Sequence, residues 1–164
     1  MAKASQAVIL ENEFYIIKAP NGKVLEVKNF NTENGAAIQL WSYAGHPWQQ
    51  WQFVDAGEGR WRICNRFTGK MIDLALGGVV EGTWLHQWSR TSGLSQCWEL
   101  ESTRNGRTRI RNVLADKYID LVGMNTSNGA QAQIWNFVAG GNQEWTLGPV
   151  SYTHLRAHET VLDL

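Results

Sequence analysis

The sequence predicts an all-β domain built from three copies of one unit of about 47 residues. The first observation is a Gln-x-Trp motif that recurs in strict register along the chain. The second is a further tryptophan ten residues before the tryptophan of each motif, and the third is an acidic residue that recurs at the same interval. These residues are Gln49 and Trp51, Gln96 and Trp98, and Gln143 and Trp145; then Trp41, Trp88 and Trp135; and then Glu26, Asp73 and Asp120.

Each unit is expected to contain about four short strands, or about twelve in all. Apolar residues alternate with polar ones over short runs such as Ile38–Trp41, without the 3.6-residue spacing of helices. Asn34-Gly35 and Asn128-Gly129 predict hairpin turns, because both residue types tolerate positive φ, and Glu81-Gly82 takes the same place in the second unit. Propeller blades have a similar period but usually number four or more, whereas three units can close a barrel.

The composition is that of a folded globular protein and excludes several partners. Hydrophobic residues make up 43% and charged residues 18% of the chain, and the formal net charge is zero, so we expect no nucleic-acid partner. No stretch approaches the roughly 18 apolar residues of a membrane span, so no membrane insertion is expected. The first residues lack the apolar segment of a signal peptide, which predicts a cytoplasmic or non-classically secreted protein. Two cysteines are too few for a disulfide framework.

Three units that each end in Gln-x-Trp resemble the ricin-B-type (R-type) lectins, which have the β-trefoil fold. The third unit carries the pattern most fully, from Lys117-Tyr118-Ile119-Asp120 to Asn142-Gln143-Glu144-Trp145, and the second unit looks most like the fungal galactose-binding members. The resemblance covers residues 14–149. It implies a β-trefoil lectin domain over residues 1–149, with repeats 14–60, 61–107 and 108–149. It also implies binding of terminal galactose or N-acetylgalactosamine on glycoproteins or glycolipids.

The residues from 150 to 164 match nothing in the three units. They resemble the translation of a sequencing adapter, so we interpret them as a non-native tail and exclude them from the fold. The alternative is an ordinary polar tail or a short terminal helix. If the adapter interpretation holds, the native chain is expected to continue differently after residue 149, and some relatives carry a further domain there.

A sugar presents a patch of C–H groups and a fringe of hydroxyls, so its binding site needs an aromatic platform beside a carboxylate and an amide. Strand alternation places Gln39 and Trp41 on the face opposite Ile38 and Leu40, and the same parity holds in the third unit. If the aliphatic residues face the core, the tryptophans face solvent. Gln87 breaks the rule at a core position, where it either hydrogen-bonds locally or marks a distorted strand.

By resemblance, each unit supplies one sugar pocket, and the three pockets are unequal. The third has the full set, which is Asp120, Gln133, Trp135 and Asn142. The second has Asp73, His86 and Trp88, with Ser95 in place of the asparagine. The first has Glu26, Gln39 and Trp41, with Trp48 in place of the asparagine, where the indole either fills the pocket or extends the platform.

The Gln-x-Trp residues are assigned to structure: Gln49, Gln96 and Gln143 are expected to tie loops to the backbone, and Trp51, Trp98 and Trp145 to fill the core. No cofactor, metal site or catalytic group is expected. The sequence has no phosphate loop of the Gly-x-x-x-x-Gly-Lys type and no His-Glu-x-x-His motif, and each unit supplies one acid where a glycosidase needs two. A homodimer is compatible with the sequence. Two alternatives stay open: a carbohydrate-binding module of a truncated larger enzyme or toxin, directed at xylan or another glycan, and a trefoil that binds protein.

Overall fold

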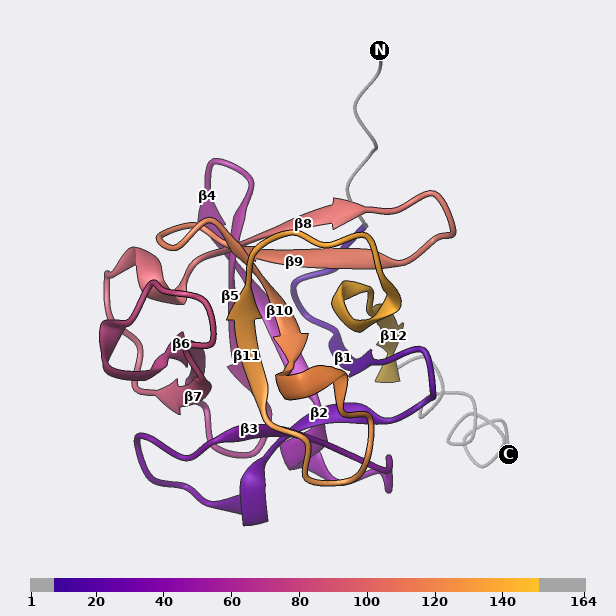
Figure 1. Cartoon of the computed structure of the whole chain (residues 1–164). Coiled ribbons are helices and arrows are strands. Elements are labelled where there is room, and N and C mark those ends of the chain that lie inside the picture. The colour runs from indigo at the N-terminus through magenta and orange to yellow at the C-terminus, as the bar shows by residue number, and fades with distance from the viewer. Residues whose placement is uncertain (1–7, 151–164) are drawn as a thin grey trace.

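The structure is a computed structural model that describes residues 8–150. Within this range the chain forms twelve strands and six three-residue 3-10 turns, which confirms the predicted all-β class (Figure 1). The described part contains no helix long and apolar enough to cross a membrane. Residues 151–164, which include nearly all of the predicted tail, lie outside the described residues, as do residues 1–7.

The strands repeat in the same order in each unit. They are β1 (Phe14–Lys18), β2 (Val24–Val27), β3 (Ile38–Trp41), β4 (Trp51–Gly57), β5 (Arg60–Asn65), β6 (Met71–Leu74), β7 (Leu85–Trp88), β8 (Trp98–Ser102), β9 (Thr108–Asn112), β10 (Lys117–Leu121), β11 (Ala132–Trp135) and β12 (Thr146–Pro149). The 3-10 turns are η1 (Lys28–Phe30), η2 (Pro47–Gln49), η3 (Ala75–Gly77), η4 (Leu94–Gln96), η5 (Val122–Met124) and η6 (Gly141–Gln143).

Six strands form a closed barrel. Strand β1 pairs with both β12 and β4, β4 pairs with β5, β5 with β8, and β8 with β9. The ring closes between Thr108 and Trp145, whose backbones exchange hydrogen bonds of 2.7 and 2.8 Å. Closure gives each barrel strand a partner on both sides, so the barrel presents no free strand edge. The first and last units of the sequence therefore meet where β12 lies beside β1 (Figure 1).

The remaining strands form one hairpin in each unit: β2 with β3, β6 with β7, and β10 with β11. Isolated bridges connect these hairpins to one another, between Ala37 and His86, Gln39 and Gln131, and Trp84 and Gln133. A six-stranded barrel with three such hairpins is the β-trefoil.

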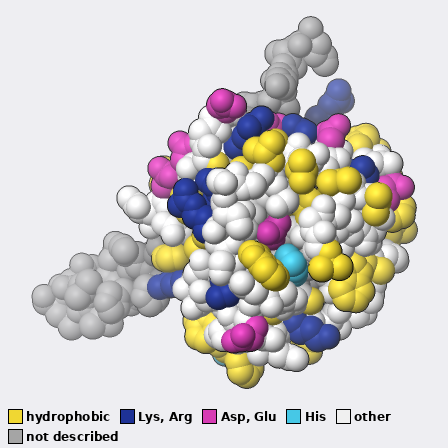
Figure 2. Space-filling model, turned by 90° about the vertical axis from the view of Figure 1, so that its left-hand side faces the viewer, with side chains coloured by type: hydrophobic (Ala, Val, Ile, Leu, Met, Phe, Trp, Pro, Cys, Tyr) yellow, Lys and Arg dark blue, Asp and Glu magenta, His cyan; other side chains and the backbone are white. Residues whose placement is uncertain are grey.

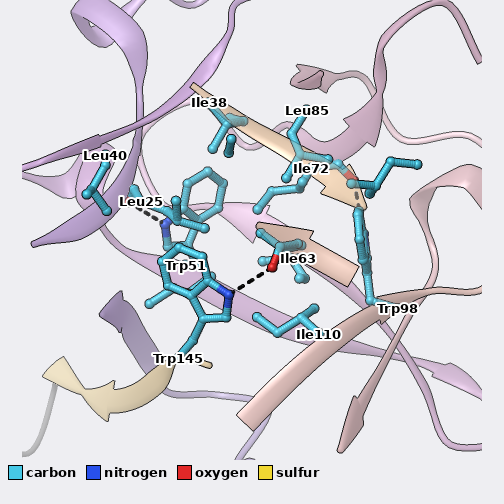
Figure 3. Close-up of a cluster of buried hydrophobic side chains, with 14 of the residues drawn as sticks. Leu25, Ile38, Leu40, Trp51, Ile63, Ile72, Leu85, Trp98, Ile110 and Trp145 are labelled. Atoms are coloured by element: carbon cyan, nitrogen blue, oxygen red, sulfur yellow. Dashed lines mark hydrogen bonds between the residues drawn. The ribbon is translucent and has the colours of Figure 1, made fainter. Parts of the chain in front are cut away.

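The three tryptophans of the Gln-x-Trp motifs lie in the core. Trp51, Trp98 and Trp145 are at most 1% exposed, and aliphatic residues such as Ile63 and Leu85 pack in the same cluster (Figure 3). Each indole Nε1–H donates to a backbone carbonyl 26 residues earlier in its own unit, at 3.0, 3.2 and 3.2 Å. A buried N–H without a partner costs free energy, so these bonds stabilise the buried indoles and fix the barrel to the hairpin of each unit.

The Asn-Gly turns differ from the prediction. The glycines at 35, 82 and 129 have positive φ, but Asn34 and Asn128 do not, and ten residues rather than two separate β2 from β3. The Asn34 Oδ1 instead accepts a hydrogen bond from the backbone N–H of Ser89 at 2.9 Å, in the next unit. Asn128 does the same for Ser42. Both asparagine side chains therefore hydrogen-bond to a neighbouring unit, and the backbone does not form the two-residue hairpin turn that the dipeptide alone favours.

The polar residue at a core position, Gln87, is fully buried and hydrogen-bonded. Its Nε2 donates to the carbonyls of Asn31 and Glu33 at 2.8 and 2.9 Å, and its Oε1 accepts from the Thr68 hydroxyl at 2.9 Å. Strand β7 keeps its regular register, with Gln87 opposite Ile72. Of the two explanations for a polar residue at this core position, hydrogen bonding, partly to the neighbouring unit, is therefore correct, and strand distortion is not.

Candidate functional site

Each hairpin holds one buried carboxyl group directly opposite a polar residue of the partner strand. The opposed pairs are Glu26 with Gln39, Asp73 with His86, and Asp120 with Gln133. The carboxyl-bearing residues are 5%, 8% and 3% exposed. In every unit the glutamine of the Gln-x-Trp motif donates its Nε2–H to this carboxyl group, at distances of 3.1, 3.0 and 3.2 Å. The motif therefore orients the acid as well as supporting the core.

The same three glutamines also hold the loop that follows the outward tryptophan. The Gln143 Nε2 donates to the Asn136 carbonyl at 2.8 Å, and its Oε1 accepts from the Val138 N–H at 3.0 Å. Gln49 and Gln96 make the corresponding pairs of bonds. One side chain in each unit thus ties together the acid, the loop and the barrel.

The third unit brings its four predicted residues into one pocket of about 350 Å³. The Asp120 Oδ1 accepts from Gln133 Nε2 at 3.1 Å, and its Oδ2 accepts from Asn142 Nδ2 at 3.1 Å. Together with Gln143, three side-chain amides therefore surround one carboxyl group. Burial raises the pKa of Asp120 above its ordinary value, and the three amide hydrogen bonds oppose that rise.

The second pocket, of about 250 Å³, contains Asp73, His86, Trp88 and Ser95. The His86 ring stacks on Trp88, with centroids 5.3 Å apart and planes 23° apart. The Asp73 Oδ1 accepts from the backbone N–H of Leu74 at 2.7 Å, a bond that takes the place of an amide side chain. Burial lowers the pKa of His86, and the neighbouring Asp73 partly offsets this effect. The uncharged imidazole is therefore the favoured form in the folded protein.

The first pocket, of about 220 Å³, contains Glu26, Gln39, Trp41 and Trp48. The Glu26 carboxylate accepts from Gln39 Nε2 at 2.8 Å and from Gln49 at its other oxygen. Trp48 lines this pocket together with Trp41 and leaves it open, and an extension of the aromatic platform stays the prediction for this indole.

The three platform tryptophans face solvent, as the alternation predicted. Trp41, Trp88 and Trp135 are 42%, 39% and 37% exposed. The glutamines on the same side, Gln39 and Gln133, are only 5% and 7% exposed, because they lie at the floor of the pockets against the acids. Figure 2 shows the face that carries β6 and β7, where hydrophobic side chains form separate patches among polar ones.

The sequence did not reveal one wall of each pocket, which is the 3-10 turn that directly follows the acid-bearing strand. Phe30, Leu76 and Met124 come from these turns, line the pockets and are 58%, 101% and 68% exposed. All three turns contain left-handed backbone, with non-glycine residues at positive φ. Such strain gathers at functional sites. The only sequence signal for this wall is an apolar residue that follows each acid, four positions after the first acid and three or four positions after the other two.

The fold and these three clefts define a β-trefoil of the lectin class. The model of the ricin-type beta-trefoil lectin domain-like family matches residues 6–88 and 94–164, and the chain belongs to this family. A search of curated proteins found no match.

Among solved structures, the chain is similar to ThreeFoil, a designed threefold-symmetric protein, with 31% identity and a TM-score of 0.82 over 84% of this chain and 99% of that one. It is also 31% identical to an exo-β-1,3-galactanase from Clostridium thermocellum, with a TM-score of 0.83 over 87% of this chain, and it spans only 31% of that enzyme. The C-terminal half of an earthworm R-type lectin, solved with N-acetylgalactosamine, shares the fold at 22% identity and a TM-score of 0.68, over 84% of this chain and 99% of that one.

Proposed function

We propose that the protein is a lectin that binds terminal galactose or N-acetylgalactosamine through up to three repeat-related pockets. The observation that carries the proposal is the repeated pairing of a buried, amide-held carboxyl group with a half-exposed tryptophan in all three units. The family membership and the lectins among its structural neighbours support carbohydrate as the class of ligand.

The chemistry of the third pocket suits a sugar. A carboxylate can accept hydrogen bonds from two adjacent hydroxyls, and bonds to a charged acceptor are stronger than neutral ones. The Asn142 amide beside Asp120 can both donate to and accept from hydroxyls. The Trp135 ring offers an apolar surface for a C–H patch. An axial 4-hydroxyl next to such a patch places both features of galactose within reach of one carboxylate and one indole.

Single open pockets for neutral sugars bind weakly, so we expect function to depend on several pockets engaging one glycosylated surface. Linking weak sites raises the overall affinity without any new contact. The differences among the pockets then imply unequal contributions, with the third, which has the most amide donors around its acid, binding most strongly.

A glycan array and a sugar titration test the proposal. In a background in which Glu26→Ala and Asp73→Ala silence the other pockets, Asp120→Asn should weaken galactose binding at least about tenfold, because it removes a charge-assisted acceptor. Asp116→Asn is the matched control, since Asp116 is an exposed acid of the same unit outside the pocket. Equal binding by the two variants would contradict the assignment of the pocket, and an array without any glycan signal would favour a protein-binding trefoil.

A carbohydrate-binding module of a larger enzyme or toxin is the second candidate. The observation that favours it is the 31% identity to part of a galactanase chain. This candidate predicts array signals on polysaccharides such as galactan or xylan rather than on terminal sugars of glycoproteins, so the same array distinguishes the two.

A further inference from the structure

The first pocket has an aromatic wall at positions where the other two pockets have no aromatic residue. Three residues form this wall, which we call the aromatic shelf: Phe30, His46 and Trp48. The corresponding positions are Gly77, Gly93 and Ser95 in the second unit and Met124, Gly140 and Asn142 in the third. The shelf lies in the same pocket as Trp41 and Glu26, so this pocket offers two aromatic surfaces rather than one.

The shelf is held in place from both sides of the unit boundary. The Trp48 ring stacks on His46 with centroids 4.2 Å apart and planes 14° apart, and Phe30 lies 5.0 Å from Trp48 at a tilt of 44°. Phe67, from the second unit, meets the Trp48 ring edge-on at 5.6 Å. The His46 backbone is held as well: its N–H donates to the Gln49 Oε1 at 3.4 Å, and its carbonyl accepts from the Gln49 N–H at 2.9 Å. A surface fixed in this way loses little conformational entropy when it binds a ligand.

The polar side of the first pocket is correspondingly poorer. Glu26 accepts two amide hydrogen bonds, from Gln39 and Gln49, whereas the acid of the third pocket accepts three. The third amide, which Asn142 supplies to Asp120 in the third unit, is replaced here by Trp48. The first pocket therefore has fewer groups for the hydroxyls of one sugar ring and more apolar surface beside it.

We propose that the first pocket recognises two linked sugar residues. The terminal residue lies against Glu26 and Trp41, and the C–H face of the next residue lies on the aromatic shelf. The second and third pockets bind the terminal residue alone. This inference rests on the proposed lectin function and adds a specificity for the residue next to the terminus, with Trp48 as its determinant.

The test isolates the pockets and compares a monosaccharide with disaccharides. With Asp73→Ala and Asp120→Ala silencing the others, the first pocket is titrated by NMR with methyl β-galactoside and with galactosyl disaccharides in β1,3, β1,4 and α1,6 linkage. At least one disaccharide should bind about five- to tenfold more tightly than the monosaccharide, the range expected for one added aromatic contact. The third pocket, isolated by Glu26→Ala and Asp73→Ala, should show a ratio near one.

Variants at the shelf make the test specific. Trp48→Asn copies the third unit and should bring the ratio for the first pocket to about one, whereas Trp48→Phe should retain most of the preference. Urea midpoints check that both variants fold, and His46→Gly, which copies the other two units, replaces Trp48→Asn if the latter does not fold.

Three outcomes decide against the inference. A ratio of one for every disaccharide at the first pocket overturns it, and so does a preference that Trp48→Asn leaves unchanged. Binding of sugars at the third pocket but of none at the first overturns it while leaving the proposed function intact. If no pocket binds any of the probes, the proposed function itself is wrong.

Discussion

Exchanging Gln143 for glutamate changes almost nothing in shape but reverses one interaction at the floor of the third pocket. The Gln143 Nε2 donates to the Asp120 Oδ2 at 3.2 Å and to the Asn136 carbonyl at 2.8 Å, and the side chain is fully buried. Gln143→Glu removes both donors and places a second carboxyl group against the first. It keeps the acceptor for the Val138 N–H.

The size of the effect follows from these contacts. A hydrogen bond to a charged group contributes about 1.5–3 kcal/mol and a neutral one about 1 kcal/mol, so the lost donors account for about 3 kcal/mol. Two charges at this distance repel by about 5 kcal/mol at an effective dielectric constant of about 20, which is an upper limit because the pair takes up a proton instead. At pH 8 we expect the free energy of unfolding to fall by about 3–5 kcal/mol, a large part of the roughly 5–15 kcal/mol of a typical domain.

The sign of the pH dependence is the sharper test. Repulsion raises the pKa of the carboxyl pair in the folded variant above its value in the unfolded chain, so the folded variant binds more protons. Its stability must then fall as pH rises through that raised pKa and recover on acidification. At pH 5 a shared proton restores one donor, and the loss should shrink to about 1–2 kcal/mol.

Urea unfolding at pH 5 and pH 8, with the parent protein at each pH, measures both quantities. Gln143→Leu serves as a control, since it removes the same donors without adding a second carboxyl group. Its loss should depend less on pH than that of Gln143→Glu, because only the pKa of Asp120 rises when the amide that opposes that rise is removed. Asn142→Asp adds a carboxyl group beside Asp120 at a half-buried position, where solvent screening should make the effect smaller. A Gln143→Glu variant as stable as the parent at pH 8, or equally destabilised at both values, would refute the reasoning.

Two further predictions concern His86 in the second pocket and Trp145 in the core. Burial lowers the pKa of His86, so the folded state resists its protonation and the free energy of unfolding should fall as pH drops through about 6.5. His86→Gln, which copies the other units, should flatten this pH dependence of the urea midpoint between pH 7.5 and 5. An unchanged slope would show that His86 is not its source. Trp145→Phe removes the indole hydrogen bond to the Ile119 carbonyl and leaves a void in the core. In urea titrations it should lower the free energy of unfolding by about 2–3 kcal/mol. A loss below about 0.5 kcal/mol would be inconsistent with the role of Trp145 in the core.

Much of the fold could be predicted because the sequence itself aligns the equivalent positions of the three units. Residues such as Trp51 recur at fixed intervals, and alternation along Ile38–Trp41 separates the core face from the outer face. The alternation was less informative for Gln39. It predicts which side of the strand a side chain lies on, but it does not predict how deeply that side is buried. Gln39 faces the same way as Trp41 and is nevertheless buried beneath the pocket.

The parts that could not be predicted depend on contacts between units. Nothing near Asn34 in the sequence indicates that its side chain bonds to Ser89, and that contact explains why the dipeptide does not form the predicted hairpin turn. The left-handed backbone at Leu76 is similarly hidden, because an apolar residue rarely adopts it and only the surrounding structure holds it there. The pocket wall formed by these turns therefore became visible only in three dimensions.

The braces between units also determine what a single repeat can do by itself. Asn128 of the third unit holds the segment after Trp41 in the first, Asn34 of the first holds the segment after Trp88 in the second, and Glu81 of the second contacts Asn136 in the third. Each unit thus receives a hydrogen bond from another unit, and the segment next to every platform tryptophan is held by a side chain of a different copy. An isolated 47-residue repeat would carry all of a pocket's ligand-facing side chains and still lack the scaffold that places them. In a protein of this design, recognition is a property of the closed ring, and no pocket can be transplanted with its own repeat alone.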